Sequence, residues 1–202
     1  MKARIQSKFC LIIVVLFFTQ CSNKDNLNKE EYLKYVIDES NGLKNRKTIG
    51  GINYTLQYLP SKFMVLTNEE NIIVDSIVGK EEQYSELEYF KLTIEEEKKE
   101  EKSRFLFLKS PAEYNRLLQY ANTQLNSAIE LNVDKEKYNC VMSYAEVGYK
   151  VTPKIIFLMA FNKPKQINDF KVSFKDEIFG NGIINFLMQR KDLEKLRIIK
   201  II

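Results

Sequence analysis

The chain contains no histidine and no tryptophan among its 202 residues. Histidine is the commonest general base, the commonest metal ligand and the usual partner of a serine or cysteine nucleophile. Tryptophan often forms the platforms on which sugars stack, and the tyrosines and phenylalanines that could replace it lie in patterns typical of a core. Glycine-rich phosphate loops, the nucleophile-elbow pattern and Cys-x-x-Cys motifs are also missing. We therefore expect no enzymatic activity, no cofactor and no metal.

The first twenty residues have the order of charged and apolar residues that a secretory signal requires. Lys2, Arg4 and Lys8 form a positive start, and an unbroken apolar run of ten residues, Phe9–Phe18, follows them. A membrane-spanning helix needs roughly 20 apolar residues, so this run is too short to serve as one. The polar residues 22–25 then end the apolar segment. These features indicate an exported chain whose signal peptide, residues 1–20, is cleaved.

The end of this segment, Phe18-Thr19-Gln20-Cys21, resembles the lipobox of bacterial lipoproteins. It is similar to the relaxed form of some Gram-negative lineages, since Gln20 stands where a small residue is typical. The resemblance covers the signal peptide and the few residues after it, and extends to no closer family. It implies that Cys21 carries the lipid that binds the protein to the membrane. Because Ser22 replaces the aspartate that retains many lipoproteins in the inner membrane, the resemblance also implies an outer-membrane location, facing the periplasm or the cell surface.

Removal of the signal peptide changes both the charge and the cysteine content. Three basic residues and no acidic ones leave with it, so the net charge falls from +4 to +1. No strong positive field for a nucleic acid remains. Cys10 is removed and Cys21 is lipidated, so Cys140 alone remains and an intramolecular disulfide is excluded. A lone cysteine in an apolar stretch is expected to be a small buried hydrophobic residue.

The mature chain is predicted to be a short lipidated tether, residues 21–28, followed by one α+β domain over residues 29–202. No internal repeat and no low-complexity linker interrupts the second part. We expect a mixed, mainly antiparallel β-sheet packed by two or more helices.

Two capping patterns predict the helices. Asn28 and Glu31 form the first pattern, at the start of a helix over about 29–39 that ends at Asn41-Gly42. The second is Ser110-Pro111-Ala112-Glu113, which begins a helix of about 18 residues over 110–128. An apolar stripe along this helix indicates contact with the core.

Alternation of apolar and polar residues predicts most of the strands. The clearest strand runs from Ile52 to Tyr58 and ends at Pro60. Ile155–Phe161 is apolar throughout, which favours a central strand covered on both faces. Residues 61–79 give conflicting signals, a short helix at 63–66 and a strand at 72–74. Further strands are expected at 141–147, 170–174, 183–186 and 196–202, with a helical turn over 189–195.

Two hairpins are expected. The alternating residues 90–94 are followed by a wholly charged block, Glu95–Lys102, and then by the apolar run Phe105–Leu108. Two strands that flank a charged connector predict a long hairpin with a solvated tip, although the charged block could also bind a partner. The tight turn Gly180-Asn181-Gly182 predicts the second hairpin.

Asp176, Glu177 and Asn181 beside this turn are the weak candidate for a binding site. Carboxylate, amide and backbone oxygens suit Ca²⁺, which takes about six to eight of them. The cluster offers too few ligands and matches no calcium-loop spacing. Exposed acids beside a glycine turn are the favoured interpretation.

Three functions remain open. The favoured one is a non-catalytic, lipid-anchored outer-membrane protein that binds an envelope partner or supports an envelope assembly. The second is a carrier that encloses a lipid or another apolar ligand, which predicts a wide apolar cavity. The third is a hydrolase in which two carboxylates converge in a cleft.

Overall fold

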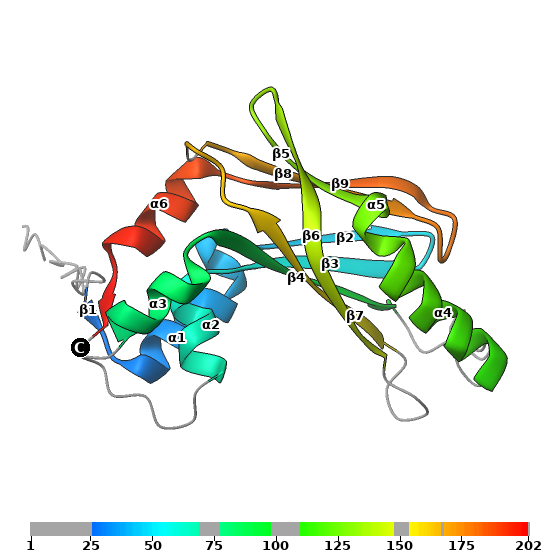
Figure 1. Ribbon diagram of the computed structural model, residues 1–202, viewed down its shortest axis with the longest axis horizontal. Helices are drawn as coiled ribbons and strands as arrows, with labels where there is room; N and C mark the ends of the chain where they lie inside the picture. Colours follow the sequence, from blue (N-terminus) through cyan, green and yellow to red (C-terminus); the bar gives the residue numbers. More distant parts are fainter. Residues whose placement is uncertain (1–25, 69–76, 98–109, 148–153, 167, 202) are drawn as a thin grey trace, which may run out of the picture.

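A computed structural model describes residues 26–68, 77–97, 110–147, 154–166 and 168–201 of the chain. Cys21, the apolar run 105–108 and the ambiguous residues 72–74 lie outside the described residues. The fold is α+β, as predicted, and forms one domain in which an eight-stranded sheet carries helices at its two ends (Figure 1).

Each strand of the large sheet is antiparallel to its neighbours. A parallel pair does occur among the described residues, but in a separate two-stranded sheet, where β1 (Asn26–Leu27) pairs with β10 (Lys200–Ile201). Asn26 and Leu27 thus belong to the fold, although they lie inside the segment expected to be tether. In spatial order the eight strands are β2 (Lys44–Ile49), β3 (Ile52–Leu59), β4 (Leu87–Glu96), β7 (Lys154–Asn162), β6 (Glu136–Val147), β5 (Ile129–Val133), β8 (Phe170–Asp176) and β9 (Gly182–Met188).

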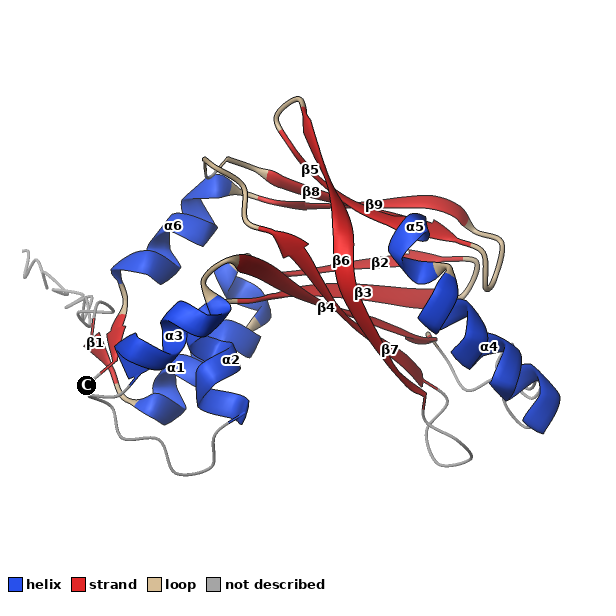
Figure 2. Cartoon of the chain, viewed as in Figure 1, coloured by secondary structure: helices blue, strands red, loops and turns tan. Residues whose placement is uncertain are grey.

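The sheet curls until its first and last strands approach each other. The Asn45 side-chain amide on β2 donates a hydrogen bond of 3.1 Å to the Leu187 carbonyl on β9. Figure 2 shows β8 and β9 lying over β2 and β3, with β6 and β7 crossing between them. The result is a barrel-like sheet that has an inner and an outer face.

Aromatic rings fill the inner face. The ring centroid of Phe90 on β4 lies 5.6 Å from that of Phe161 on β7 and 6.2 Å from that of Phe170 on β8. The contact with Phe170 joins strands on opposite sides of the curled sheet. Phe157 and Phe174 meet in the same way at 6.5 Å. All of these side chains are fully buried. Aromatic pairs of this kind stabilise a core beyond the area they bury, and here they occupy the space in which a carrier would hold its ligand.

Four helices gather at one end of the curled sheet and form what we call the cap (Figure 2). Tyr32 and Val36 on the first of them are fully buried, as the helical spacing predicts. None of the described helices combines the length and the apolar character needed to cross a membrane. The cap helices are α1 (Lys29–Ile37), α2 (Ser61–Asn68), α3 (Ile77–Tyr84) and α6 (Arg190–Ile198).

The predicted capping box of α1 is confirmed. The Asn28 side chain accepts from the Glu31 backbone N–H at 3.0 Å, and the Glu31 carboxylate accepts from the Asn28 N–H at 2.9 Å. After a short 3₁₀ turn, Gly42 adopts a left-handed conformation with φ of 74°. A Cβ atom at Gly42 would lie 2.3 Å from the Asp192 Oδ2 atom of α6, so a glycine is required for this contact between α6 and the rest of the cap.

The helix predicted over 110–128 is divided into α4 (Pro111–Thr123) and α5 (Leu125–Ala128). Its Ser110 N-cap makes no side-chain hydrogen bond, so the second capping box is wrong. The Thr123 hydroxyl donates to the Gln119 carbonyl at 2.7 Å. Such back-bonding bends helices and accounts for the break at Gln124. The buried stripe Leu117, Ala121 and Leu125 continues across the break and packs on the core, as expected.

Several strand predictions need correction. The hairpin expected around the charged block is wrong, because β4 pairs with β3 along one edge and with β7 along the other. The strand predicted at 141–147 is confirmed as part of β6, but a bulge between Cys140 and Met142 leaves Val141 exposed, so the expected alternation begins only at Ser143. The final strand expected over 196–202 begins later than predicted, because residues 196–198 belong to helix α6 and only Lys200–Ile201 forms a strand among the described residues. The strands at 52–58, 155–161 and 170–174 and the hairpin at Gly180–Gly182 are confirmed.

Candidate functional site

Asp176 is buried, although the sequence predicted that it belongs to an exposed acidic cluster. Its side chain is only 3% exposed. Oδ1 accepts from the backbone N–H groups of Ile178 and Phe179, both at 3.0 Å. Oδ2 accepts from the Tyr54 hydroxyl at 2.6 Å and from the Asn181 N–H at 3.1 Å. The expectation of an exposed acid is therefore wrong, and the carboxylate holds the β8–β9 turn in place.

The other two members of this cluster are also engaged in structural contacts. Glu177 forms an exposed ion pair of 2.6 Å with Lys175. The Asn181 side-chain amide donates to the Tyr54 hydroxyl at 2.6 Å. Gly180 and Gly182 both have positive φ, as the predicted turn requires. Within the described ranges, no group of three acidic or cysteine side chains is placed to hold a metal ion.

A polar cavity of about 110 Å³ lies between the cap and the end of the curled sheet. Its apolar wall comes from Phe170 on β8 and from Leu193 and Leu196 on α6. The polar side chains that line it come from α1, β3, α2, α3 and β4 and from the residues just after α3 and β7: Tyr32, Tyr58, Ser61, Lys62, Glu81, Ser85, Glu88 and Lys163. We call this the cap cavity.

Tyr32 is among the residues that line the cap cavity. Its side chain is fully buried, and its hydroxyl has no hydrogen-bond partner among the described residues. Burial raises the pKa of Tyr32 well above its usual value, and the negative charge of Glu81 adds to this effect. A buried hydroxyl without a partner costs about 1–3 kcal/mol. Among the described residues, the Tyr32 hydroxyl is thus an unsatisfied buried polar group.

Two carboxylates border the same space. Glu88, at the start of β4, is only 5% exposed, and its Oε2 atom accepts from the Tyr58 hydroxyl at 2.5 Å. Glu81 on α3 is half-buried, and its Oε1 atom accepts from the Ser61 hydroxyl at 2.7 Å. Both acids therefore have a hydroxyl donor that orients the carboxylate beside the cavity.

Two lysines complete the lining. The Lys62 ammonium donates to the Ile199 carbonyl at 3.1 Å, and the Lys163 ammonium donates to the Ser85 carbonyl at 2.8 Å. Backbone carbonyls orient these cations without neutralising them. Within the part of the chain that the structure describes, Lys62, Lys163 and Glu81 form no ion pair.

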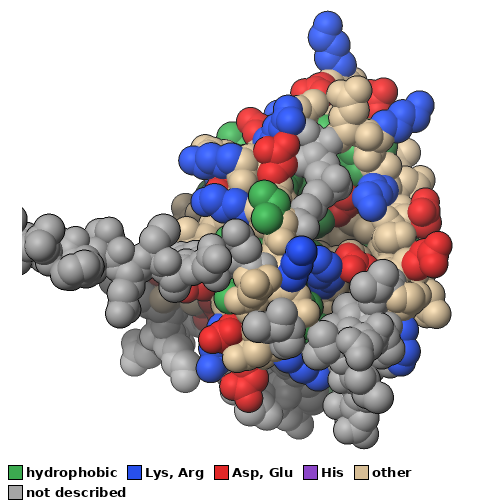
Figure 3. All heavy atoms as spheres, turned by 90° about the vertical axis from the view of Figure 1, so that its left-hand side faces the viewer, with side chains coloured by type: hydrophobic (Ala, Val, Ile, Leu, Met, Phe, Trp, Pro, Cys, Tyr) green, Lys and Arg blue, Asp and Glu red, His purple; other side chains and the backbone are tan. Residues whose placement is uncertain are grey.

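No family model, no curated protein and no solved structure matches this chain. The site must therefore be judged by its own chemistry. Figure 3 looks onto the cap end and shows basic and acidic side chains interspersed, without a field of one sign. A phosphate or nucleic-acid surface would show a concentration of positive charge.

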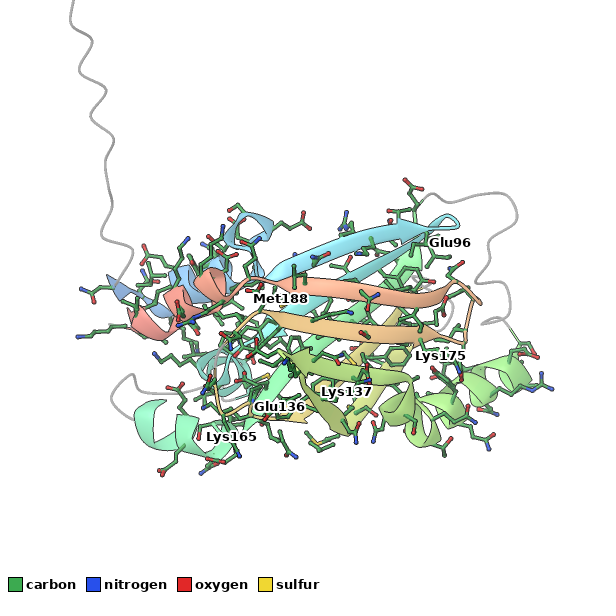
Figure 4. All side chains as sticks on the ribbon, turned by 90° about the horizontal axis from the view of Figure 1, so that it is seen from above. Glu96, Glu136, Lys137, Lys165, Lys175 and Met188 are labelled. Atoms are coloured by element: carbon green, nitrogen blue, oxygen red, sulfur yellow. The ribbon has the colours of Figure 1, made fainter. Side chains whose placement is uncertain are left out.

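A second hollow lies beside the turn between β5 and β6, where Glu136 and Lys165 come together (Figure 4). Two of its polar side chains have partners in exposed positions, since the Tyr138 hydroxyl donates to Glu136 and the Asn168 amide donates to Asp134. The cap cavity is the better candidate because two of its polar residues, Tyr32 and Glu88, are buried.

The cap cavity was not predicted, because its lining residues follow ordinary patterns in the sequence. Tyr32 follows the helical spacing of a core residue. Cys140, which was predicted to be buried, is a free buried thiol. Burial raises the pKa of the Cys140 thiol, so it is a poor nucleophile. Glu88 stands among strand residues and resembles any solvated acid. These positions meet only when α1, α3 and β4 pack together.

Proposed function

We propose that this chain is a lipid-anchored outer-membrane protein that binds a small polar solute in the cap cavity without transforming it. The observation that carries the proposal is the cap cavity of about 110 Å³, which is lined by polar side chains from several elements, among them the carboxylates of Glu81 and Glu88 and the ammonium groups of Lys62 and Lys163.

The lipobox resemblance at Cys21 supports the anchor. Because Asn26 and Leu27 pair with the C-terminal strand β10 beside the cap, the tether leaves the domain at the cap end (Figure 1). An extended residue spans at most about 3.5 Å. The segment from Cys21 to Asn26 would then hold the cap within about 20 Å of the membrane lipid.

The alternative of an apolar carrier has less support, since aromatic rings occupy the inside of the curled sheet. Hydrolysis remains the second candidate, because Glu81 and Glu88 line one cavity. A glycosidase needs room for a sugar on each side of the scissile bond. A cavity of about 110 Å³ is smaller than that, which favours binding of one small molecule.

Thermal unfolding of the lipidated protein in detergent micelles tests the binding proposal. Small polyols, zwitterions, anions and cations would be added separately. We expect one class to raise the midpoint in a saturable way in the wild-type protein and in Glu30→Gln, but not in Glu81→Gln. Glu30 is the matched control, because it is exposed and lies outside the cap cavity. If no class acts, or if both variants lose the effect, the proposal fails.

Turnover separates binding from hydrolysis. Incubation with a panel of glycosides and esters should release no product above the level of Glu88→Gln. Product released by the wild-type protein and lost in this variant would establish the hydrolase instead. Co-purification of a stoichiometric lipid would support the carrier.

The anchor has its own test. Cys21→Ser should abolish labelling by a radioactive or clickable fatty acid and move the protein out of the membrane fraction. Labelling that persists in this variant would contradict the lipid anchor, whatever the cavity binds.

A further inference from the structure

A further hollow, of about 470 Å³, lies on the outer face of the curled sheet, over β5, β8 and β9. Figure 4 looks onto this face from outside the sheet. The volume lies within the range of about 300–1,000 Å³ that small-molecule sites occupy. The outward-facing side chains of the three strands that line it are Glu130, Lys171, Ser173, Lys175, Ile183 and Asn185. We call it the outer hollow.

The register of the sheet places these side chains around Ser173. Ser173 on β8 lies opposite Asn185 on β9 and Glu130 on β5. Lys171 and Lys175 lie two residues away on either side along β8, so they project from the same face. Neighbouring strands lie about 4.8 Å apart and rise about 3.4 Å per residue, so the Cα atoms span about 10 Å by about 14 Å. One small organic molecule can therefore contact the whole group.

The carboxylate in the outer hollow, that of Glu130, already has partners. The Asn132 amide and the Lys137 ammonium donate to it, at 3.2 Å each. These hydrogen bonds, together with the nearby positive charge of Lys171, hold the pKa of Glu130 below its usual value. Glu130 is therefore ionised at neutral pH and shares its single negative charge between two lysines.

Positive charge is in excess around the outer hollow. The Lys175 ammonium forms an ion pair of 2.6 Å with Glu177. Among the described residues, Lys171 forms no ion pair and its ammonium makes no hydrogen bond. Three lysines, at positions 137, 171 and 175, thus share the two carboxylates of Glu130 and Glu177. An anionic group that enters the hollow beside Lys171 would balance the remaining charge.

The centre of the outer hollow offers uncharged donors and acceptors. The Ser173 hydroxyl donates to Asn185 Oδ1 at 2.8 Å. This bond leaves both N–H groups of the Asn185 amide and the lone pairs of the Ser173 oxygen for a ligand. Ile183, on the same strand as Asn185, is 67% exposed and gives the hollow an apolar border. Hydroxyl groups both donate and accept, so they suit this centre, which a bare acid would leave unused.

We propose that the outer hollow binds an acidic sugar, a saccharide unit that carries a carboxylate or a phosphate. The acid group lies against Lys171, because a hydrogen bond between two charged groups is roughly twice as strong as a neutral one. The hydroxyl groups bond to Asn185 and Ser173, and the C–H face of the sugar ring covers Ile183. The described residues that line this site and those that line the cap cavity have no member in common, so the inference goes beyond the proposed function.

Isothermal titration calorimetry on the full-length protein, in a detergent without a sugar head group, tests the inference. Glucuronate and glucose 6-phosphate carry both the acid and the hydroxyl groups, whereas glucose lacks the acid and acetate lacks the hydroxyl groups. We expect saturable binding of at least one acidic sugar, and affinities roughly tenfold or more weaker for glucose and acetate. Binding of glucose or acetate as tight as that of the acidic sugars would overturn the inference, and so would the absence of binding by both acidic sugars.

Charge variants locate the site. Lys171→Gln removes the excess charge and should weaken binding of the acidic sugar roughly tenfold, whereas Lys171→Arg should retain most of it. Lys191→Gln removes an equal charge at an exposed position on α6 and should leave the affinity unchanged. Circular dichroism would establish that each variant is folded. Unchanged affinity in folded Lys171→Gln would overturn the inference.

Glu81→Gln separates this inference from the proposed function, because Glu81 lines the cap cavity and not the outer hollow. We expect this variant to bind the acidic sugar as the wild-type protein does. Loss of binding in Glu81→Gln, with none in Lys171→Gln, would place the ligand in the cap cavity. That outcome would overturn the outer site and support the proposed function.

Discussion

Strand β3 carries two tyrosines, four residues apart on its inner face, and each donates its hydroxyl to a buried carboxylate. Tyr54 donates to Asp176 at 2.6 Å, and Tyr58 donates to Glu88 at 2.5 Å. Three backbone N–H groups of the β8–β9 turn also donate to Asp176. Glu88 instead borders the cap cavity, beside a hydroxyl without a partner. The same local pairing thus serves a structural role at one end of the sheet and forms part of a candidate binding site at the other.

The largest difference in stability is expected when Asp176 and Glu88 are each replaced by the corresponding amide. Asp176→Asn places an NH₂ group against two donors, so we expect a loss of about 3–4 kcal/mol in the free energy of unfolding. Glu88→Gln retains an acceptor for Tyr58 and should lose less than about 1 kcal/mol. Urea unfolding measures both, and similar losses in the two variants would remove the distinction.

The next largest difference in the free energy of unfolding is expected between alanine variants of Gly42, in the cap, and Gly180, in the β8–β9 turn. Both have positive φ, but a Cβ at Gly42 meets Asp192 whereas one at Gly180 meets nothing within 4 Å. Gly42→Ala should cost about 2–4 kcal/mol, and Gly180→Ala only the conformational term of about 1 kcal/mol. The double variant Gly42→Ala/Asp192→Ala should recover part of the loss. No recovery in urea unfolding would show that the contact is not the cause.

Alkaline pH should weaken the cap through Tyr32. Because burial raises its pKa, the folded protein retains the phenolic proton at pH values where the unfolded chain releases it. The stability is complete below about pH 10 and falls above it, by at most about 1.4 kcal/mol per pH unit for this group. Tyr120, which is less buried, should contribute less. A stability-versus-pH curve of Tyr32→Phe that falls as steeply as that of the wild type would contradict this.

The smallest expected effect compares the two tyrosines directly. Both hydroxyls are buried without a partner among the described residues. Tyr32→Phe and Tyr120→Phe should therefore each raise the free energy of unfolding of the ligand-free protein, by about 1 kcal/mol at most. If water occupies the cap cavity in solution, Tyr32→Phe will show no gain while Tyr120→Phe still does. A loss of stability in Tyr120→Phe would mean that its hydroxyl has a partner.

Local patterns predicted the parts of the fold that depend on neighbouring residues. The capping box at Asn28 joins atoms three residues apart, and the alternation in β3 and β8 follows the pleat of a single strand. Strand β2, with the polar sequence Lys44–Ile49, was not predicted, because it lies at the edge of the sheet and has little apolar periodicity.

The candidate site could not be predicted in the same way. Asp176 was expected to be exposed because it adjoins Glu177 and a glycine turn. Its burial depends on Tyr54, which is 122 residues away in the chain. The cap cavity requires residues from α1, α2, α3 and β4 to converge, and each follows an ordinary pattern in its own segment. Partners that are distant in the sequence determine which polar residues have a structural role and which are available to bind a ligand.

The pairing of Asn26–Leu27 with Lys200–Ile201 also has a consequence for the order of folding. Contacts between residues far apart in the chain require closure of a long loop and form slowly. The curled sheet consists largely of hairpins and can form earlier. Strand β1 would then be among the last parts to become ordered. If Cys21 is lipidated as we propose, the orientation of the domain to the bilayer is fixed only at the end of folding, when β1 pairs with β10.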